Sequence, residues 1–223
     1  MKKSKKIDKH NIKNKPILLD KNIVLKLDNV WFRFNNKSPW LFTKLNSSSR
    51  LADRVVVQGR NGVGKTTLLR CIMGTYVPTK GKIIIPTTTK IGVQLQQISY
   101  PEWLKVKQIA TFFGNMINLS VNEIKKQNCY KYFRIDEIWS RVANSLSNGQ
   151  KRRFNLMLSF INHPNLILLD EPTAELDKDW TMKTVKYINN YLRYNKASLW
   201  LFTNNENEIK LFHIHKRIIL NGQ

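Results

Sequence analysis

The segment with the clearest chemical potential runs from Gly59 to Thr66 and reads GRNGVGKT. Its glycines let successive backbone N–H groups turn inward around an anion, and the helix expected to follow adds a partial positive charge. Lys65 would reach the β- and γ-phosphates, and the Thr66 hydroxyl would ligate Mg²⁺. The alternative is a glycine-rich turn without a ligand. The pattern favours a phosphate-binding loop with these contacts: Gly59, Asn61, Gly62, Gly64, Lys65, Thr66 and Thr67.

A second candidate lies further along the chain, where Asn165–Glu171 reads NLILLDE. A buried strand that ends in two carboxylates places them at the carboxyl edge of a parallel sheet, where ligands of such sheets bind. Asp170 is suited to hold the Mg²⁺ shell, and Glu171 to orient and deprotonate water against a γ-phosphate. A strand that ends in solvated acids is common by itself. Beside a phosphate loop, however, the pair predicts a site that binds ATP and Mg²⁺ and hydrolyses ATP.

The elements that must position these groups follow from hydrophobic patterning. Arg54–Gln58 and Ser198–Thr203 are short strand candidates like Asn165–Asp170, and helical patterns lie between them. Strands that alternate with helices predict an α/β fold, a P-loop NTPase core with a mostly parallel sheet. The alternation from Asn22 to Phe34 predicts an N-terminal antiparallel β portion, and Glu102–Tyr132 is mostly helical in pattern.

The domain organisation is expected to be simple. A chain of 223 residues has room for one substantial α/β domain with a small inserted lobe. We expect residues 1–20 to form a basic, flexible tail and residues 21–223 to form the folded domain. A small helical lobe is expected within that domain, over about residues 97–146.

The net charge of +23 raises the question of nucleic acid or an anionic membrane surface as a partner. Lysine is spread along the chain beside abundant Asn and Ile, which favours a compositional bias, and we expect no specific nucleic acid. No apolar run approaches the roughly 20 residues needed to span a bilayer. The Lys-rich start does not resemble a secretory signal, and two cysteines make neither a disulfide framework nor a metal cluster. These features favour a cytosolic protein.

Between the phosphate loop and the acidic strand stands Leu146–Gln150, which reads LSNGQ and is followed by KRRFNL. On local sequence alone it is a helix N-cap at Ser147 with a basic first turn. The segment and its position just upstream of the acidic pair resemble the signature of the ATP-binding cassette family. The resemblance to this family covers nearly the whole chain, residues 22–222. It implies that Ser147 and the Gly149 backbone contact the γ-phosphate held by a second subunit, in a head-to-tail homodimer or with a paralogous cassette. The basic run is then a helix face.

The segment Ile91–Gln96, IGVQLQ, resembles the glutamine loop of the family. The resemblance implies that Gln96 approaches Mg²⁺ and the attacking water. Gln94 and Gln97 are rival candidates that their spacing ranks lower.

Two further positions match the family in order. Pro172–Asp177 resembles the loop after the acidic pair, which implies that Asp177 lies at a dimer interface and helps to bind the nucleotide. Phe34 is the best match to the aromatic residue that stacks on adenine. A place in the core of a strand is the alternative for Phe34.

The sequence departs from the family at several positions. Where the family has a His after the late strand, this chain has Asn204, which could hydrogen-bond the γ-phosphate but cannot carry a proton as imidazole does. Hydrolysis is therefore expected to be slow. His213 and His215 fall too late in the chain and are expected at the surface. Asn148 replaces the second signature glycine, a mild change because Asn tolerates a positive φ. Ala52-Asp53 stands where a glycine turn is usual, with little expected consequence.

Within the family, the chain resembles the separate nucleotide-binding subunits of short drug, bacteriocin-immunity or haem exporters, through IGVQLQ, Tyr100–Gln108 and Phe112-Phe113. The resemblance implies a cytoplasmic protein, peripheral on the inner face of the cell membrane, that binds separate transmembrane permease subunits through Gln96–Trp103. For Tyr100 and Trp103 the alternative is packing in the lobe core. Two other functions stay open: a soluble cassette that acts on ribosomes or nucleic acid, and a weakly hydrolysing structural protein.

Overall fold

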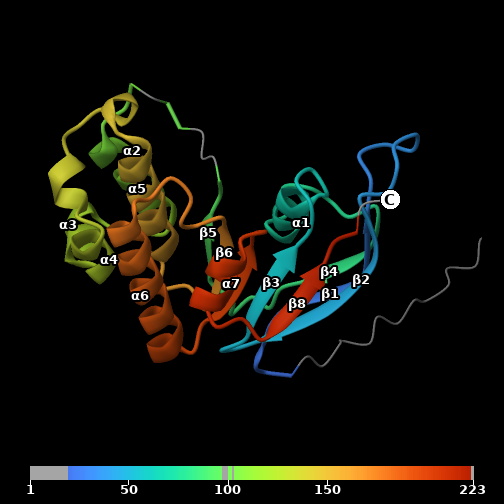
Figure 1. The fold of residues 1–223 in the computed structure, drawn as a ribbon. Helices are drawn as coiled ribbons and strands as arrows, with labels where there is room; N and C mark the ends of the chain where they lie inside the picture. Colours follow the sequence, from blue (N-terminus) through green and yellow to red (C-terminus); the bar gives the residue numbers. More distant parts are fainter. Residues whose placement is uncertain (1–19, 97–99, 102, 222–223) are drawn as a thin grey trace, which may run out of the picture.

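A five-stranded parallel sheet and a three-stranded antiparallel sheet organise the molecule, with a group of helices at one end (Figure 1). The structure is a computed structural model that describes residues 20–96, 100–101 and 103–221. The basic tail expected over residues 1–20 lies, except for Asp20, outside the described residues. The two sheets confirm the expected α/β fold with a mostly parallel sheet and an N-terminal antiparallel portion.

The parallel sheet positions the candidate site. Its strands are β3 (Arg54–Gln58), β5 (Ile91–Gln94), β6 (Leu166–Asp170), β7 (Ser198–Phe202) and β8 (Lys216–Ile219). They follow the order β5-β6-β7-β3-β8, and all neighbouring pairs are parallel. The central strands are nearly continuous apolar runs because both of their faces are covered. Since the carboxyl ends of parallel strands meet at one edge, the segments that follow β3, β5, β6 and β7 gather there.

The antiparallel sheet consists of β1 (Ile23–Phe32), β2 (Phe42–Arg50) and β4 (Lys80–Ile84), in the order β2-β1-β4. The alternation predicted from Asn22 to Phe34 forms the single strand β1. Val30 and Phe32 are buried, whereas Trp31 between them is only half-buried. One face of this sheet therefore belongs to the core, as period-two patterning requires.

Seven α-helices occur in the described residues. They are α1 (Lys65–Ile72), α2 (Val106–Met116), α3 (Val121–Lys126), α4 (Asn128–Tyr132), α5 (Asn148–Phe160), α6 (Lys178–Asn195) and α7 (Glu206–Leu211), with 3₁₀ turns η1 (Ile135–Ile138) and η2 (Ala143–Ser145). Within these described residues, no helix combines the length and the apolarity that crossing a membrane requires.

Alternate residues of the central strands supply two hydrophobic cores. Val55 and Val57 of β3 pack with α1 and the inner face of the antiparallel sheet. Val56, between them, packs in a second core with α5, α6 and the helical lobe. Trp200 and Leu201 of β7 are divided between the two cores in the same way. The pleat sends successive side chains to opposite faces, so each central strand stabilises both layers.

The helical lobe contains α2, α3, α4 and η1 and lies beside α5 and α6 at the end of the molecule away from β8 (Figure 1). The segment with the helical pattern is divided into three helices. Asn118 adopts a left-handed conformation with φ 58°, which Asn tolerates better than most residues. Ser120 then begins α3 with a capping box that includes Glu123. The break is therefore specified by local turn and capping residues.

Candidate functional site

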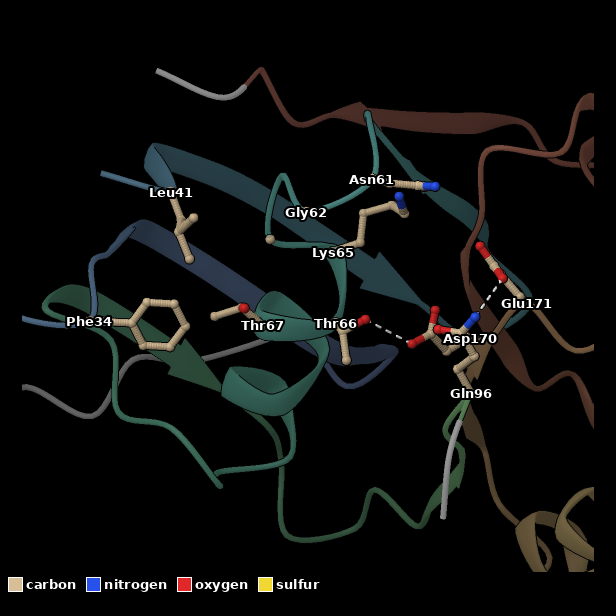
Figure 2. A pocket seen from close by; sticks show the side chains of 11 residues that line it. Phe34, Leu41, Asn61, Gly62, Lys65, Thr66, Thr67, Gln96, Asp170 and Glu171 are labelled. Atoms are coloured by element: carbon tan, nitrogen blue, oxygen red, sulfur yellow. Dashed lines mark hydrogen bonds between the residues drawn. The ribbon is translucent and has the colours of Figure 1, made fainter. Parts of the chain in front are cut away.

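An elongated cavity of about 540 Å³ lies at the carboxyl edge of the parallel sheet, a size within the usual range for small-molecule sites. Figure 2 shows Phe34 and Leu41 toward one end, the phosphate loop with Lys65 in the middle, and the acidic pair with Gln96 at the other end. The cavity is therefore apolar at one end and acidic at the other, with a lysine between. Its lining residues are Phe34, Leu41, Asn61, Gly62, Gly64, Lys65, Thr66, Thr67, Gln96, Asp170 and Glu171.

The phosphate loop connects the end of β3 to the start of α1. Gly64 is the N-cap of α1 and has φ 109°, a conformation that disfavours any side chain. Gly59 does not line the cavity of about 540 Å³, but a Cβ atom there would lie 2.5 Å from the Leu220 carbonyl oxygen. Glycine at these two positions is thus a requirement of backbone conformation and of close packing.

Lys65 is only 8% exposed, and its ammonium group lies against its own loop. Its Nζ donates hydrogen bonds to the carbonyl oxygens of Gly59, at 2.7 Å, and Arg60, at 3.4 Å. Burial lowers the pKa of the Lys65 ammonium, and the carboxylates of Glu171 and Asp170 oppose this shift. The loop therefore holds one buried positive charge beside the row of glycine N–H groups.

Thr66 and Asp170 form the junction between α1 and β6. The Thr66 hydroxyl donates to Asp170 Oδ2 at 3.0 Å, and Asp170 is 2% exposed. Burial raises the pKa of Asp170, while the Thr66 hydrogen bond opposes the rise. Two oxygen atoms that could ligate a metal ion, the Thr66 hydroxyl and a carboxylate oxygen of Asp170, lie together here at the rim of the phosphate loop. This donor set fits Mg²⁺, which is held by oxygen ligands and usually by only one or two carboxylates.

Gln96 and Glu171 face one another across the acidic end of the cavity (Figure 2). Gln96 Nε2 donates to Glu171 Oε2 at 3.1 Å. Glu171 has φ 48°, a left-handed conformation that is uncommon for a residue with a side chain. The Gln94 amide is buried and donates to the carbonyl oxygens of Leu95 and Asp170. Gln97 lies outside the described residues, so among the described glutamines of this loop Gln96 is the one that lines the cavity.

Asn204 contacts the phosphate loop directly. Its Oδ1 accepts a hydrogen bond from the Gly59 N–H at 3.0 Å, and its Nδ2 donates to Asn61 Oδ1 at 3.2 Å. Asn204, Asn61 and Glu171 also line an adjoining cavity of about 390 Å³. Position 204 therefore lies beside both the loop and the acidic pair. His213 and His215 are exposed, as expected, and the His215 ring accepts a hydrogen bond from the Arg54 N–H.

Phe34 follows the end of β1 and is 62% exposed, so it is not a strand core residue. Its ring makes edge contacts with Phe32 and Tyr76, at centroid distances of 5.3 and 6.1 Å. Leu41 lines the same end of the cavity, and sequence reasoning missed it. The only indication was its apolar type, which in a short strand-like run is no different from that of a core residue.

The signature segment and Asp177 lie outside the cavity lining. Ser147 caps α5, and its hydroxyl accepts a hydrogen bond from the Gln150 N–H. Asp177 caps α6 in the same way through the Trp180 N–H at 2.8 Å. Both side chains are exposed. Asn148 is the first residue of α5 and has no positive φ, so the conformational tolerance expected of Asn is not used there.

The basic run after the signature does not form an exposed helix face. Arg152 and Arg153 are 3% and 6% exposed, respectively. Arg152 donates to the Ala174 and Leu95 carbonyl oxygens, and Arg153 to the Phe133 carbonyl oxygen. The run lies in α5, as expected, but Arg152 and Arg153 are on a buried face of this helix, because both guanidinium groups bridge α5 to other segments. They are not available to a nucleic-acid backbone.

The expected docking segment is only partly described, because residues 97–99 and 102 lie outside the described residues. Tyr100 is half-buried, and its ring packs against Phe154 of α5 at a centroid distance of 6.0 Å. Trp103 is 77% exposed. Packing in the lobe core thus accounts for Tyr100, whereas Trp103 presents a large apolar surface to solvent.

The comparison with protein families decides the classification. The family model described as ABC transporter matches residues 42–174. This chain belongs to the ABC transporter family. The match begins at β2 and ends just after the acidic pair, so it includes the phosphate loop and the signature segment of the cassette.

Two curated relatives and one solved structure show the range of the similarity. ATP-binding cassette sub-family F member 3 of Mus musculus is 31% identical over 188 residues, 84% of this chain and 26% of that protein. The zinc import ATP-binding protein ZnuC of Rickettsia prowazekii (strain Madrid E) is 30% identical over 157 residues, 69% of this chain and 64% of that protein. A dimeric, post-hydrolysis ATP-binding cassette bound to ADP and Pi aligns with a TM-score of 0.78 at 22% identity, over 88% of this chain and 94% of that chain.

The chain covers nearly all of the solved cassette but only part of the two curated relatives. The structural alignment shows that the chain has the cassette fold. The cassette spans about a quarter of the mouse relative and just under two thirds of the bacterial one. Activities and partners of those whole proteins are therefore matters for a proposal.

Proposed function

We propose that this cassette binds and hydrolyses ATP and is the ATPase subunit of a membrane transporter. One observation carries the proposal: a phosphate loop, two oxygen donors suited to Mg²⁺ and a Gln–Glu pair all line one cavity. The apolar end formed by Phe34 and Leu41 suits a base, and the loop in the middle suits a triphosphate. A structural protein without turnover would not need the carboxylate of Glu171 at the end of that cavity.

The residues divide the chemistry between binding and water activation. The loop N–H groups and Lys65 hold the phosphates, which requires Lys65 to leave the carbonyl oxygens of Gly59 and Arg60. Glu171 orients a water molecule and takes its proton, and Gln96 positions the Glu171 carboxylate relative to that water. Thr66 and Asp170 would hold Mg²⁺, which when bound neutralises phosphate charge. Asn204 donates toward the terminal phosphate from beside the loop.

The complete site is proposed to need a second copy or a paralogous cassette. Ser147, Gly149 and Asp177 line none of the cavity of their own chain, and the side chains of Ser147 and Asp177 are exposed. The N-terminus of α5, which Ser147 caps, favours an anion. A head-to-tail pair would bring these groups of one copy to the phosphates held by the other. The dimeric cassette structure with the same fold supports this arrangement.

The transport role is proposed from the family and from the similarity to a subunit named for zinc import. We place the cassette at the inner face of the cell membrane, bound to separate permease subunits. The resemblance to short exporters favours export, whereas the ZnuC similarity favours import. The similarity to the mouse sub-family F protein, which is much longer than one cassette, favours a second candidate, a soluble cassette that acts on ribosomes or nucleic acid.

Two measurements test the proposed function. The purified chain should release phosphate from ATP only when Mg²⁺ is present, and it should co-purify in mild detergent with a membrane protein. ATP binding without any phosphate release would contradict the ATPase assignment. Co-purification with ribosomes or nucleic acid in place of a membrane protein would favour the second candidate, and the identity of a captured permease decides the direction of transport.

Replacing Asn204 with His should raise the turnover number, by up to about 10²-fold, because imidazole reaches farther and can carry a positive charge toward the developing phosphoryl charge. A neutral imidazole could accept the hydrogen bond from the Gly59 N–H at one ring nitrogen and donate toward the phosphate at the other, whereas the charged ring gives up the Gly59 bond. Asn204→Ala should lower turnover, because both of its bonds to the loop are lost. Phosphate release is measured for these variants, with Asn207→His, an exposed change in α7, as the control. Equal rates for the parent, His and Ala variants would show that Asn204 is a bystander.

A further inference from the structure

Arg152 is a buried cation that the phosphate site does not account for. It lies early in α5 and is 3% exposed, whereas arginine is rarely buried unless it is paired. Its Nε donates to the Ala174 carbonyl oxygen at 3.2 Å, and its Nη1 approaches the Leu95 carbonyl oxygen at 3.5 Å. One side chain thus joins α5 to two loops that are far apart in the sequence.

Those two loops carry the side chains at the acidic end of the cavity. Leu95 directly precedes Gln96, and the Ala174 N–H donates to the Glu171 carbonyl oxygen at 3.1 Å. Gln96 and Glu171 in turn share the 3.1 Å hydrogen bond between their side chains. The Arg152 guanidinium therefore connects the backbone next to Gln96 with the loop that follows Glu171, while the two side chains are also hydrogen-bonded to one another.

Several carboxylates surround Arg152. One of them, Glu208, also holds the loop that follows Glu171. The carboxylates of Glu175, Asp170, Glu171 and Glu208 all act on the guanidinium charge. Glu208 of α7 accepts hydrogen bonds from the Thr173 N–H at 3.0 Å and from the Thr173 hydroxyl at 2.5 Å. Within the described residues its buried Oε2 has no hydrogen-bond partner. The loop after Glu171 is thus fixed by Glu208 at one residue and by Arg152 at the next.

We infer that Arg152 is a positioning residue for ATP hydrolysis, which sets Gln96 and Glu171 relative to one another by holding the Leu95 and Ala174 carbonyl oxygens. The inference rests on the proposed function. Because Arg152 lies on the helix that Ser147 begins, it also ties this pair to the segment expected to meet a second copy. Its hydrogen bonds go to Leu95 and Ala174 and not to the phosphate loop, so its main effect is on water activation rather than on nucleotide affinity.

Arg153 offers a matched control in the same helix turn. It is also buried, at 6% exposed, and also donates to a backbone carbonyl, that of Phe133 at 3.0 Å. Its guanidinium lies 4.2 Å from the Trp180 ring centroid and 3.8 Å from Glu137. These contacts hold the helical lobe and α6. Replacing Arg153 therefore disturbs a buried guanidinium of α5 without releasing Leu95 or Ala174.

The first test compares the kinetics of R152Q and R152K with those of R153Q and R153K. R152Q should lower kcat about 10- to 100-fold, as expected when catalytic groups lose their alignment, while KM and ATP affinity stay near the parent values. R152K should recover part of kcat, because an ammonium keeps the charge and can bond one of the two carbonyl oxygens. R153Q should lower stability and leave kcat near the parent. If R152Q does not fold, R152K should still turn over more slowly than R153K.

The second test needs no hydrolysis. Backbone amide exchange over residues 171–176 should become faster in R152Q and stay unchanged in R153Q, measured on the full chain. A parental kcat for R152Q, or unchanged exchange in this segment, would overturn the inference. If the parent binds ATP but releases no phosphate, the proposed function fails together with the hydrolytic role of Arg152, and the exchange still decides whether Arg152 tethers the loop.

Discussion

The Glu171→Gln variant should retain ATP binding and lose nearly all turnover. The amide keeps the size of the side chain but cannot take a proton from water, and loss of a general base typically costs about 10²- to 10⁴-fold in rate. Glu171 lies at the end of the cavity, in a left-handed conformation and hydrogen-bonded to Gln96. Phosphate release under saturating ATP measures the loss, and nucleotide affinity is measured in parallel.

The same variant should accumulate as an ATP-bound dimer, because the step that would separate the two copies no longer occurs. Size-exclusion chromatography with and without ATP reports this. Glu206→Gln is the matched control, since Glu206 is an exposed carboxylate in α7. A Glu171→Gln protein that hydrolyses ATP at the parental rate would show that another group is the base.

The Lys65→Ala variant should lose ATP affinity, because the phosphates lose the point charge that the loop supplies. A hydrogen bond to a charged group contributes about 1.5–3 kcal/mol, so the loss of one or two such bonds weakens binding by at least about 10-fold and up to about 10⁴-fold. Lys65 is buried in the loop with its Nζ at 2.7 Å from the Gly59 carbonyl oxygen. Titration of a fluorescent ATP analogue measures the dissociation constant.

A lysine outside the cavity provides the control for this change. Lys107 is exposed on α2, and Lys107→Ala should leave the affinity at the parental value. Thermal melting of Lys65→Ala without nucleotide shows whether the variant is folded. Unchanged affinity in a folded Lys65→Ala protein would refute the assignment of Gly59–Thr66 as a phosphate loop.

Features encoded by neighbouring residues could be predicted from the sequence. The strand, glycine loop and helix around Gly59–Thr66 are contiguous, and their backbone requirements fall on the residues that show the pattern. The apolar run before Asp170 similarly predicts a buried strand, which is confirmed. The same holds for β1, whose alternation reflects one buried face. Such features depend on local conformation and on burial, both of which leave periodic marks in a sequence.

Contacts between distant segments could not be predicted in this way. The partners of Asn204 on the phosphate loop, and the hydrogen bond between the side chains of Gln96 and Glu171, depend on which strand edges are adjacent. The sequence predicts a helix face for the basic run that includes Arg152, without indicating that this face is buried. The burial of its neighbours three, four and seven positions later, Asn155, Leu156 and Ser159, shows that it lies on an inward face. Because Asn155 and Ser159 are polar, the sequence pattern alone does not identify this face as buried.

The sequence by itself determined the family, the α/β class and the residues of the phosphate loop and acidic strand, because these are properties of contiguous segments. Only the tertiary structure decided that Arg152 and Arg153 are buried and that Gln96 faces Glu171. It also placed Ser147 and Asp177 outside the cavity of their own chain. The physical reason is that a buried charge or a shared hydrogen bond needs partners from other elements. The order of strands in the sheet, and not the order of residues in the chain, sets which partners are near.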